Sequence, residues 1–285
     1  MKYTKLFETH DPDYLDYINS DDVILPNLSY CEDEEKVHLN KIRNDIIIYH
    51  ASSKLTETTD KWTDGLYVNA FNTTIKSHTF ENGKGLIEFN DNLTLIGVNA
   101  FRGCTGLTTI TIPNSVTTIG DDAFRECSGL TTITIPNSVS SIGARVFQNC
   151  TSLISAILPN SITTITEMLF SYCGLTSIGV IGSGASLEIP NSVTSFGDNV
   201  FDYCTNLTSV TIPNNITSIG FSGFYGCSSL ISVTIEATTP PTLRNDNIFV
   251  NNATGRKILV PSASVEAYKS AQYWSTYASD IDAIQ

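Results

Sequence analysis

Residues 119–139 read IGDDAFRECSGLTTITIPNSV. One near-copy of this stretch begins at Ile96 and another at Ile142, so the spacing is 23 residues in both directions (119 − 96 and 142 − 119). A fixed period of roughly 20 to 50 residues is the sequence signature of a solenoid. Two residue types mark the same places in six copies, namely Phe101, Phe124, Phe147, Phe170, Phe201 and Phe224, and Cys104, Cys127, Cys150, Cys173, Cys204 and Cys227. We therefore predict a repeat solenoid.

Each copy predicts one coil that is mainly β. Apolar and polar residues alternate through residues 107–112, which is the pattern of a strand. Pro113 should end this strand because proline cannot donate to a ladder. Residues 116–120 indicate a second short extended piece, and residues 121–124 a single helical or 3₁₀ turn whose aspartates satisfy free N–H groups. One coil cannot bury its own apolar side chains, so stacked coils must share a continuous core.

The recurring pattern I-G-x-x-A-F-x-x-C-x-x-L-x-x-I-x-I-P-x-S-V resembles the BspA-like leucine-rich repeat, also called the Treponema pallidum type. The match is close in residues 96–159 and again in 196–235, which together are just over a third of the chain, and residues 237–241 and 260–268 resemble the usual ending of such proteins. The resemblance implies a right-handed leucine-rich repeat coil. It also implies microbial cell-surface proteins that contact host proteins or other cells.

The repeats divide the chain into four expected parts. Residues 1–44 do not match the repeat and indicate an N-terminal arm or attachment segment, and residues 45–92 indicate degenerate capping repeats that shield the end of the ladder. Within these, residues 45–49 predict a strand and residues 81–84 (Glu-Asn-Gly-Lys) a hairpin turn. Residues 93–236 are the repeats proper. Residues 237–285 indicate a C-terminal cap, with a helix from about Ser264 to Tyr273 and with Val265, Tyr268 and Trp274 covering the open core.

The copy that starts at Ile165 is irregular. It lacks one residue after Cys173, and a Gly- and Ser-rich insert, residues 179–186, lengthens the distance from Ile165 to Phe196 to 31 residues (196 − 165). We expect this insert to be a flexible bulge. In solenoids such insertions map to one face, often the binding face, although a surface loop can also be merely tolerated.

Composition excludes several classes of function. The net charge of −13 argues against nucleic acid or an anionic membrane as a partner. Residues 1–64 hold 14 of the 29 acidic residues, whereas residues 93–235 hold seven acidic and three basic ones. No apolar run approaches the roughly 18 residues of a membrane span. Residues 1–40 contain no basic-then-apolar leader, so we expect no classical signal peptide.

We find no constellation of residues that predicts catalysis, a cofactor or a metal ion. His10, His38, His50 and His78 all precede the repeats, and none has the spacing of a zinc helix. The stretch Gly220–Phe224 (GFSGF) lacks the final glycine of a nucleophile elbow. The cysteines form no C-x-x-C pair, so buried reduced thiols acting as small apolar groups are expected, with pairing between adjacent coils as the alternative. We therefore expect no enzyme.

What remains is a surface. In each Leu-x-x-Ile-x-Ile strand the isoleucines should point inward, so the residues between them point outward on the sheet face. This face is a ladder of hydroxyl groups with little charge and few aromatic residues, which argues against a sugar cleft built on stacking. Strand propensity alone also favours threonine, so the same ladder is consistent with a merely soluble face. The candidate partner-binding residues are Thr109, Thr111, Thr132, Thr134, Ser155, Ile157, Ser177, Glu188, Ser209, Thr211, Ser232 and Thr234.

Two functions remain open. The first is a non-enzymatic binding or adhesion protein, extracellular or on the cell surface, whose partner is a protein or glycan of a host or neighbouring cell. The second is a phage virion component, a fibre or decoration protein at the virion surface that docks or self-associates through residues 1–44. Residues 17–20 and 25–33 are faintly similar to leaders of gut Bacteroidales proteins and of the phages that infect them. An enzyme with its site in the insert or the N-terminal part is a third, less favoured reading.

Overall fold

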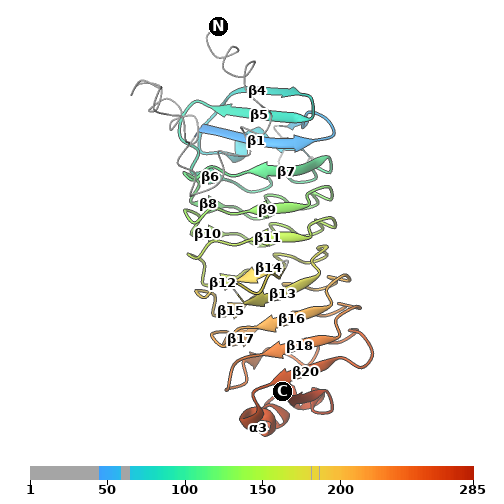
Figure 1. The fold of residues 1–285 in the computed structure, drawn as a ribbon. Helices are drawn as coiled ribbons and strands as arrows, with labels where there is room; N and C mark the ends of the chain where they lie inside the picture. The colour runs from blue at the N-terminus through green and yellow to red at the C-terminus, as the bar shows by residue number, and fades with distance from the viewer. Residues whose placement is uncertain (1–44, 59–64, 181, 186) are drawn as a thin grey trace. The chain divides into compact units, whose positions relative to one another are not determined.

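The computed structural model describes residues 45–58, 65–180, 182–185 and 187–285. The repeats form stacked coils, as predicted, and most coils contribute one strand to a long sheet and one two-residue strand to a second ladder (Figure 1). The long sheet is parallel throughout. In spatial order it contains β9 (Thr132–Thr134), β11 (Ser155–Ile157), β14 (Leu187–Ile189), β13 (Ser177–Val180), β16 (Ser209–Ile212), β18 (Ser232–Ile235), β20 (Lys257–Val260) and β21 (Ile281–Ala283).

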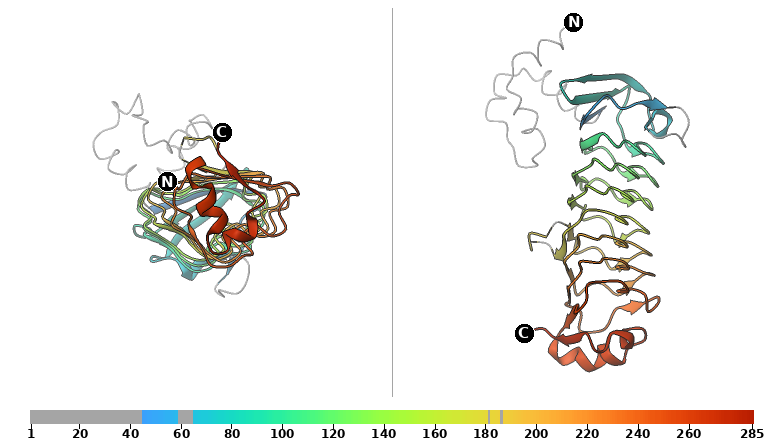
Figure 2. Two further views of the ribbon diagram at one scale, coloured as in Figure 1. Left: turned by 90° about the horizontal axis from the view of Figure 1, so that it is seen from below. Right: turned by 90° about the vertical axis from the view of Figure 1, so that its right-hand side faces the viewer.

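A column of phenylalanine rings runs through the core of the stacked coils. Phe101, Phe124 and Phe147 have no exposed surface, and their ring centroids lie 5.1 and 5.7 Å apart with nearly parallel planes. The column continues in the same way through Phe170, Phe201, Phe224 and Phe249. Because every ring packs between the rings of the neighbouring coils, the stability of the stack comes from contacts between coils and not from contacts within one coil. The side view in Figure 2 shows this stack of coils.

The cysteine column is buried and reduced, as expected, but the thiols are not only small apolar groups. The six cysteines in the described part of the chain are free thiols. The Cys127 Sγ–H donates to the Phe101 carbonyl at 3.0 Å, and the same bond recurs at Cys150, Cys173, Cys204 and Cys227. Burial raises the pKa of Cys150 to about 12. The thiols therefore stay protonated and tie each coil to the one before it.

The turns before and after each phenylalanine differ from the helical turn that we expected. Residues 121–126 form hydrogen-bonded turns in which Asp122 and Glu126 have φ of 56° and 63°. The left-handed residues recur two positions on either side of the phenylalanine in successive coils. Asp121 does accept an N–H bond as predicted, but the donor is Ala144 of the next coil, at 2.9 Å.

The second ladder depends on a column of glycines. Its strands are β6 (Leu95–Ile96), β8 (Thr118–Ile119) and β10 (Ser141–Ile142), followed by a separate group of β12 (Thr164–Ile165), β15 (Ser195–Phe196), β17 (Ser218–Ile219) and β19 (Thr242–Leu243). Gly143 follows β10, and a Cβ there would lie 2.5 Å from the Asp121 N atom. In the irregular copy this position is Thr166. The two groups of strands separate there, and Thr166 Oγ1 donates to Gly143 O of the preceding coil at 2.7 Å.

The irregular copy also contributes an additional strand to the long sheet. β13 pairs with β16, and β14 occupies the place between β13 and β11. On the phenylalanine side nothing is added, since Phe170 and Phe201 stack directly at 5.9 Å. The insert thus adds one strand to one side of the stack only.

The residues before the repeats are only partly coil-like. Val68–Ala70 (η4) continue the stack, because Ala70 O accepts the N–H of Gly97. The prediction of degenerate coils is wrong for β1 (Ile46–Ala51), β4 (Ile75–Glu81) and β5 (Lys84–Phe89), which form an antiparallel sheet with β7 (Leu107–Thr111) in the order β4-β5-β1-β7. The predicted hairpin turn is confirmed, with φ of 49° at Asn82 and 82° at Gly83. Two short strands, β2 (Glu57–Thr58) and β3 (Leu66–Tyr67), pair beside this sheet.

The C-terminal residues close the other end of the core, as predicted. They form η5 (Ser262–Ser264), α3 (Val265–Ser270) and η6 (Trp274–Tyr277). Tyr268 and Trp274 are buried, and each donates a 2.8 Å hydrogen bond to a backbone carbonyl just after the last repeat, Ala237 O and Pro241 O respectively. Among the described residues, no helix combines the length and the apolar character that a membrane crossing requires.

Candidate binding surface

The residues predicted for the sheet face lie in two columns that run along the stack. The register places Thr132 beside Ser155, and Ser177 beside Ser209 and then Ser232. In the second column Thr134 lies beside Ile157, and Thr211 beside Thr234. The side chains are exposed or half-buried, and Ile157 is 59 % exposed.

The hydroxyl groups on this face differ in their hydrogen bonding from those just before each strand begins. The hydroxyls before the strands bond to the preceding coil, since Thr117 Oγ1 donates to Thr94 O at 3.2 Å and Thr131 Oγ1 to Thr108 O at 3.3 Å. On the face, no described residue forms a hydrogen bond with the hydroxyl of Thr132, Thr134, Ser155, Ser209, Thr211, Ser232 or Thr234. The face hydroxyls are therefore available to another molecule.

The first coil of the face belongs to the N-terminal sheet. β1 pairs antiparallel with β7, and His50 Nδ1 lies 2.7 Å from Thr109 Oγ1. The edge of the face is thus extended by an antiparallel strand, and the Thr109 hydroxyl has a partner within the chain. The sequence could not show this, because it predicted a coil in this region and not an antiparallel neighbour.

The insert divides the face. Gly182 N and Gly184 N donate to the two oxygens of Glu188 at 3.0 and 2.8 Å, and these bonds lower the pKa of the Glu188 carboxyl. Gly179 is buried because residues 183 and 185 fold back over it, and a Cβ there would lie 2.4 Å from Ser183 Oγ. Glu188 thus fastens the insert onto the sheet. The insert therefore lies between the face residues of β9 and β11 and those of β16 and β18.

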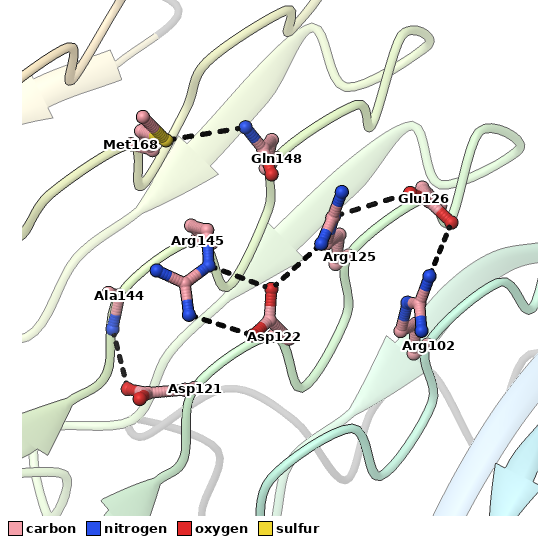
Figure 3. Close-up of polar contacts among 9 residues, drawn as sticks. All are labelled: Arg102, Asp121, Asp122, Arg125, Glu126, Ala144, Arg145, Gln148 and Met168. Carbon is pink, nitrogen blue, oxygen red and sulfur yellow. Dashed lines mark hydrogen bonds and ion pairs between the residues drawn. The ribbon is translucent and has the colours of Figure 1, made fainter. Parts of the chain in front are cut away.

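A second surface lies along the turns that flank the phenylalanine column, and the sequence analysis missed it. Its first half is charged (Figure 3). Arg145 donates two bonds of 3.1 Å to the carboxylate of Asp122, and Arg125 lies 3.5 Å from the same carboxylate. Glu126 links Arg125 to Arg102 at 3.2 and 3.5 Å. Three arginines and two carboxylates pair with one another across three coils, so most of the charge in this half is compensated within it.

The other half is aromatic. Tyr172 and Tyr203 stack with 4.7 Å between ring centroids at an angle of 12°, and Tyr225 meets Tyr203 edge-on at 5.5 Å. Tyr172 is 42 % and Tyr203 37 % exposed. The signal for the pair was in the repeat register, because each tyrosine follows its core phenylalanine by two residues.

The described residues offer one polar relay, and it is structural. Tyr49 Oη lies 2.7 Å from His78 Nε2, and His78 Nδ1 lies 2.7 Å from Glu57 Oε1. Burial lowers the pKa of His78, although the bond to Glu57 opposes the shift. Tyr49 has no exposed surface, so its hydroxyl cannot reach a substrate. Among the described residues no three His, Cys, Asp or Glu side chains gather in a way that could hold a metal ion.

A match to a protein-family model agrees with this fold. Residues 73–184 and 182–281 match a family model described as BspA type leucine rich repeat region, in six copies. No curated protein sequence matches the chain. Similar solved structures include the pneumococcal vaccine antigen PcpA (22 % identity, TM-score 0.45), the T. pallidum leucine rich repeat protein TpLRR (26 %, 0.45) and a leucine-rich repeat protein from Eubacterium ventriosum (27 %, 0.42). The matches cover 60 %, 61 % and 54 % of this chain, and 40 %, 74 % and 39 % of the respective relatives.

Proposed function

Because the chain belongs to the BspA-type leucine-rich repeat family, we propose that it is a non-enzymatic binding protein whose solenoid surface contacts a protein or glycan of a host or neighbouring cell. The observation that carries this proposal is the set of sheet-face hydroxyls without intramolecular partners. A hydroxyl that both donates and accepts is suited to either kind of partner. Threonines that serve only the fold, such as Thr117, already have their partner within the stack.

We place the protein at the cell surface, where adhesion to another cell takes place. Family membership supports this placement. The virion alternative depends on residues 1–44, which lie outside the described residues, and no observation on the described residues favours it. Fractionation of the native source separates the two: we expect the chain in washed envelopes, whereas enrichment in purified phage particles would replace the adhesion proposal with the virion one.

The face itself is tested with labelled protein and washed intact cells from the same source, counted by flow cytometry. The double variant Thr134→Glu/Thr211→Glu places two charges on the exposed face, and we expect it to lose at least about tenfold in cell binding through the desolvation of unpaired carboxylates. The matched control Thr105→Glu/Thr205→Glu changes exposed threonines in the turns and should bind as the unaltered protein does. Equal binding of both variants would exclude the sheet face as the contact surface.

A further inference from the structure

Two tyrosines on the turns that flank the phenylalanine column have a backbone conformation that is unfavourable for bulky residues. Tyr172 and Tyr203 have φ of 58° and 53°. The same column holds Gly103, Asn149, Gly226 and Asn251, residue types for which left-handed φ is least costly, and Glu126, for which it is more costly. A bulky residue in this region is under backbone strain, and such outliers concentrate at functional sites. The fold alone would favour asparagine or glycine at both places.

The rings are held in place although they are exposed. Gly226 lies directly beneath the Tyr203 ring, and a Cβ there would be 2.8 Å from Tyr203 Cδ1. Asn251 Nδ2 donates to Tyr225 Oη at 2.9 Å, and this bond fixes the ring that meets Tyr203 edge-on. The stack of Tyr172 on Tyr203 is therefore preorganised. Among the described residues, Tyr172 has no ring neighbour other than Tyr203.

The residue before Tyr203, Asp202, carries a carboxylate whose Oδ1 atom is buried. The backbone carbonyl of Asp202 accepts the N–H of Tyr172 at 2.9 Å. Burial raises the pKa of the Asp202 carboxyl, and the nearby Ser171 hydroxyl and its own amide offset this only in part. Within the described part of the chain, no Lys, Arg or His forms an ion pair with Asp202. A half-buried carboxylate without a cation is a costly arrangement.

Elsewhere in this chain the same two components are joined by an arginine. Arg244 lies 4.9 Å from the centroid of the exposed Phe221 ring, and its Nη1 donates to both oxygens of Asp198 at 3.2 Å.

The second example is at the C-terminal cap. Arg256 lies 5.3 Å from the Phe249 ring and 5.2 Å from the Tyr277 ring, and it pairs with Asp280. In both places one guanidinium lies over an aromatic ring and pairs with a carboxylate at the same time. At Tyr172 and Asp202 the ring and the carboxylate are present and the guanidinium is absent.

We propose that Tyr172 and Asp202 form a binding site for the guanidinium of an arginine side chain presented by a partner protein. Arginine fits because its planar cation can lie against an aromatic ring and donate to a carboxylate at the same time. A lysine ammonium lacks this planar geometry. The net charge of −13 also favours a basic partner. The site specifies the partner of the binding function proposed above, and it is separate from the sheet face.

The experiment uses the tripeptide acetyl-Gly-Arg-Gly-amide as the probe and the ring signals of ¹³C-labelled tyrosine as the readout. We expect saturable shifts at Tyr172 and Tyr203. The citrulline analogue has the same shape without the charge and should bind at least about tenfold more weakly. Absence of a saturable shift, or equal binding of both peptides, would overturn the proposal.

Variants identify the site. Asp202→Asn and Tyr172→Asn should each abolish binding, whereas Tyr172→Phe should retain it because the ring face is kept. Asparagine already occupies this column at Asn149 and Asn251, so Tyr172→Asn should fold, and an unchanged melting temperature verifies this. Asp91→Asn, an exposed carboxylate outside the turns that flank the phenylalanine column, is the control. Binding that survives Asp202→Asn would refute the assignment. Thr134→Glu/Thr211→Glu should leave peptide binding intact, so failure of the sheet-face proposal and failure of this site are separate results.

Discussion

Gly143→Ala is the substitution that tests most directly how the coils are held together. Gly143 N donates to Ile119 O of the preceding coil at 2.8 Å. A Cβ at this position would lie 2.4 Å from Asp121 Oδ1, 2.5 Å from Asp121 N and 2.7 Å from Gly120 C. Two of these atoms belong to the backbone, so the preceding coil must move. The equivalent residue of the next coil is Thr166, where the second ladder is interrupted.

The magnitude follows from three contributions. Overpacking by one methyl group costs about 1–3 kcal/mol. Weakening of the bond to Ile119 adds about 0.5–1.5 kcal/mol. Replacing glycine by alanine recovers about 0.4–1 kcal/mol through the unfolded state. The balance is a loss of about 2 kcal/mol in the free energy of unfolding, and for a chain of this size that lowers Tm by about 4–8 °C.

Thermal unfolding followed by circular dichroism measures this loss. The matched control is Ser140→Thr, which adds a methyl group to the same coil at an exposed position where the equivalent residue of the preceding coil is already Thr117. We expect the control to melt like the unaltered protein. If Gly143→Ala melts together with the control, close approach of the glycine backbones is not what sets the spacing of the coils.

Three further outcomes are expected. Phe147→Ala opens a cavity between two stacked rings and should cost about 3–5 kcal/mol in urea unfolding; an unchanged midpoint would contradict the shared core. Glu188→Gln weakens the acceptor of the insert amides and should speed proteolysis at residues 182–185 without changing Tm; equal cleavage rates would show that the carboxylate does not fasten the loop. Because the pKa of His78 is lowered from 6.5, its neutral form favours folding, so stability should fall as the pH drops below that value. His78→Asn should flatten this fall in Tm between pH 6.5 and about pH 5, and an unaltered slope would assign it to other groups.

The sequence predicted the parts of this molecule that repeat. The 23-residue period established the solenoid, and the fixed places of phenylalanine and cysteine predicted the buried columns, because equivalent residues of stacked coils must lie above one another. The hairpin at Asn82–Gly83 and the covering role of Tyr268 were also predictable, since both depend on local chemistry. The outward columns of the sheet face follow from the same alternation, and their role in binding stays a prediction.

The tertiary structure alone decided what happens where the period is interrupted. The sequence indicated that residues 179–186 are inserted, but whether they project or fold back depends on Glu188 reaching the amides of Gly182 and Gly184. The antiparallel pairing of β1 with β7 depends on which edge of the stack lacks a neighbour. Tyr172 and Tyr203 are 31 positions apart in the chain (203 − 172). They stack because the additional strand is added to the sheet only, so the turns that carry the two tyrosines remain direct neighbours. In a repeat, contacts between distant residues can be predicted from the spacing in the sequence, because equivalent residues stack. At an interruption, the structure depends on contacts between residues that only the folded chain brings together.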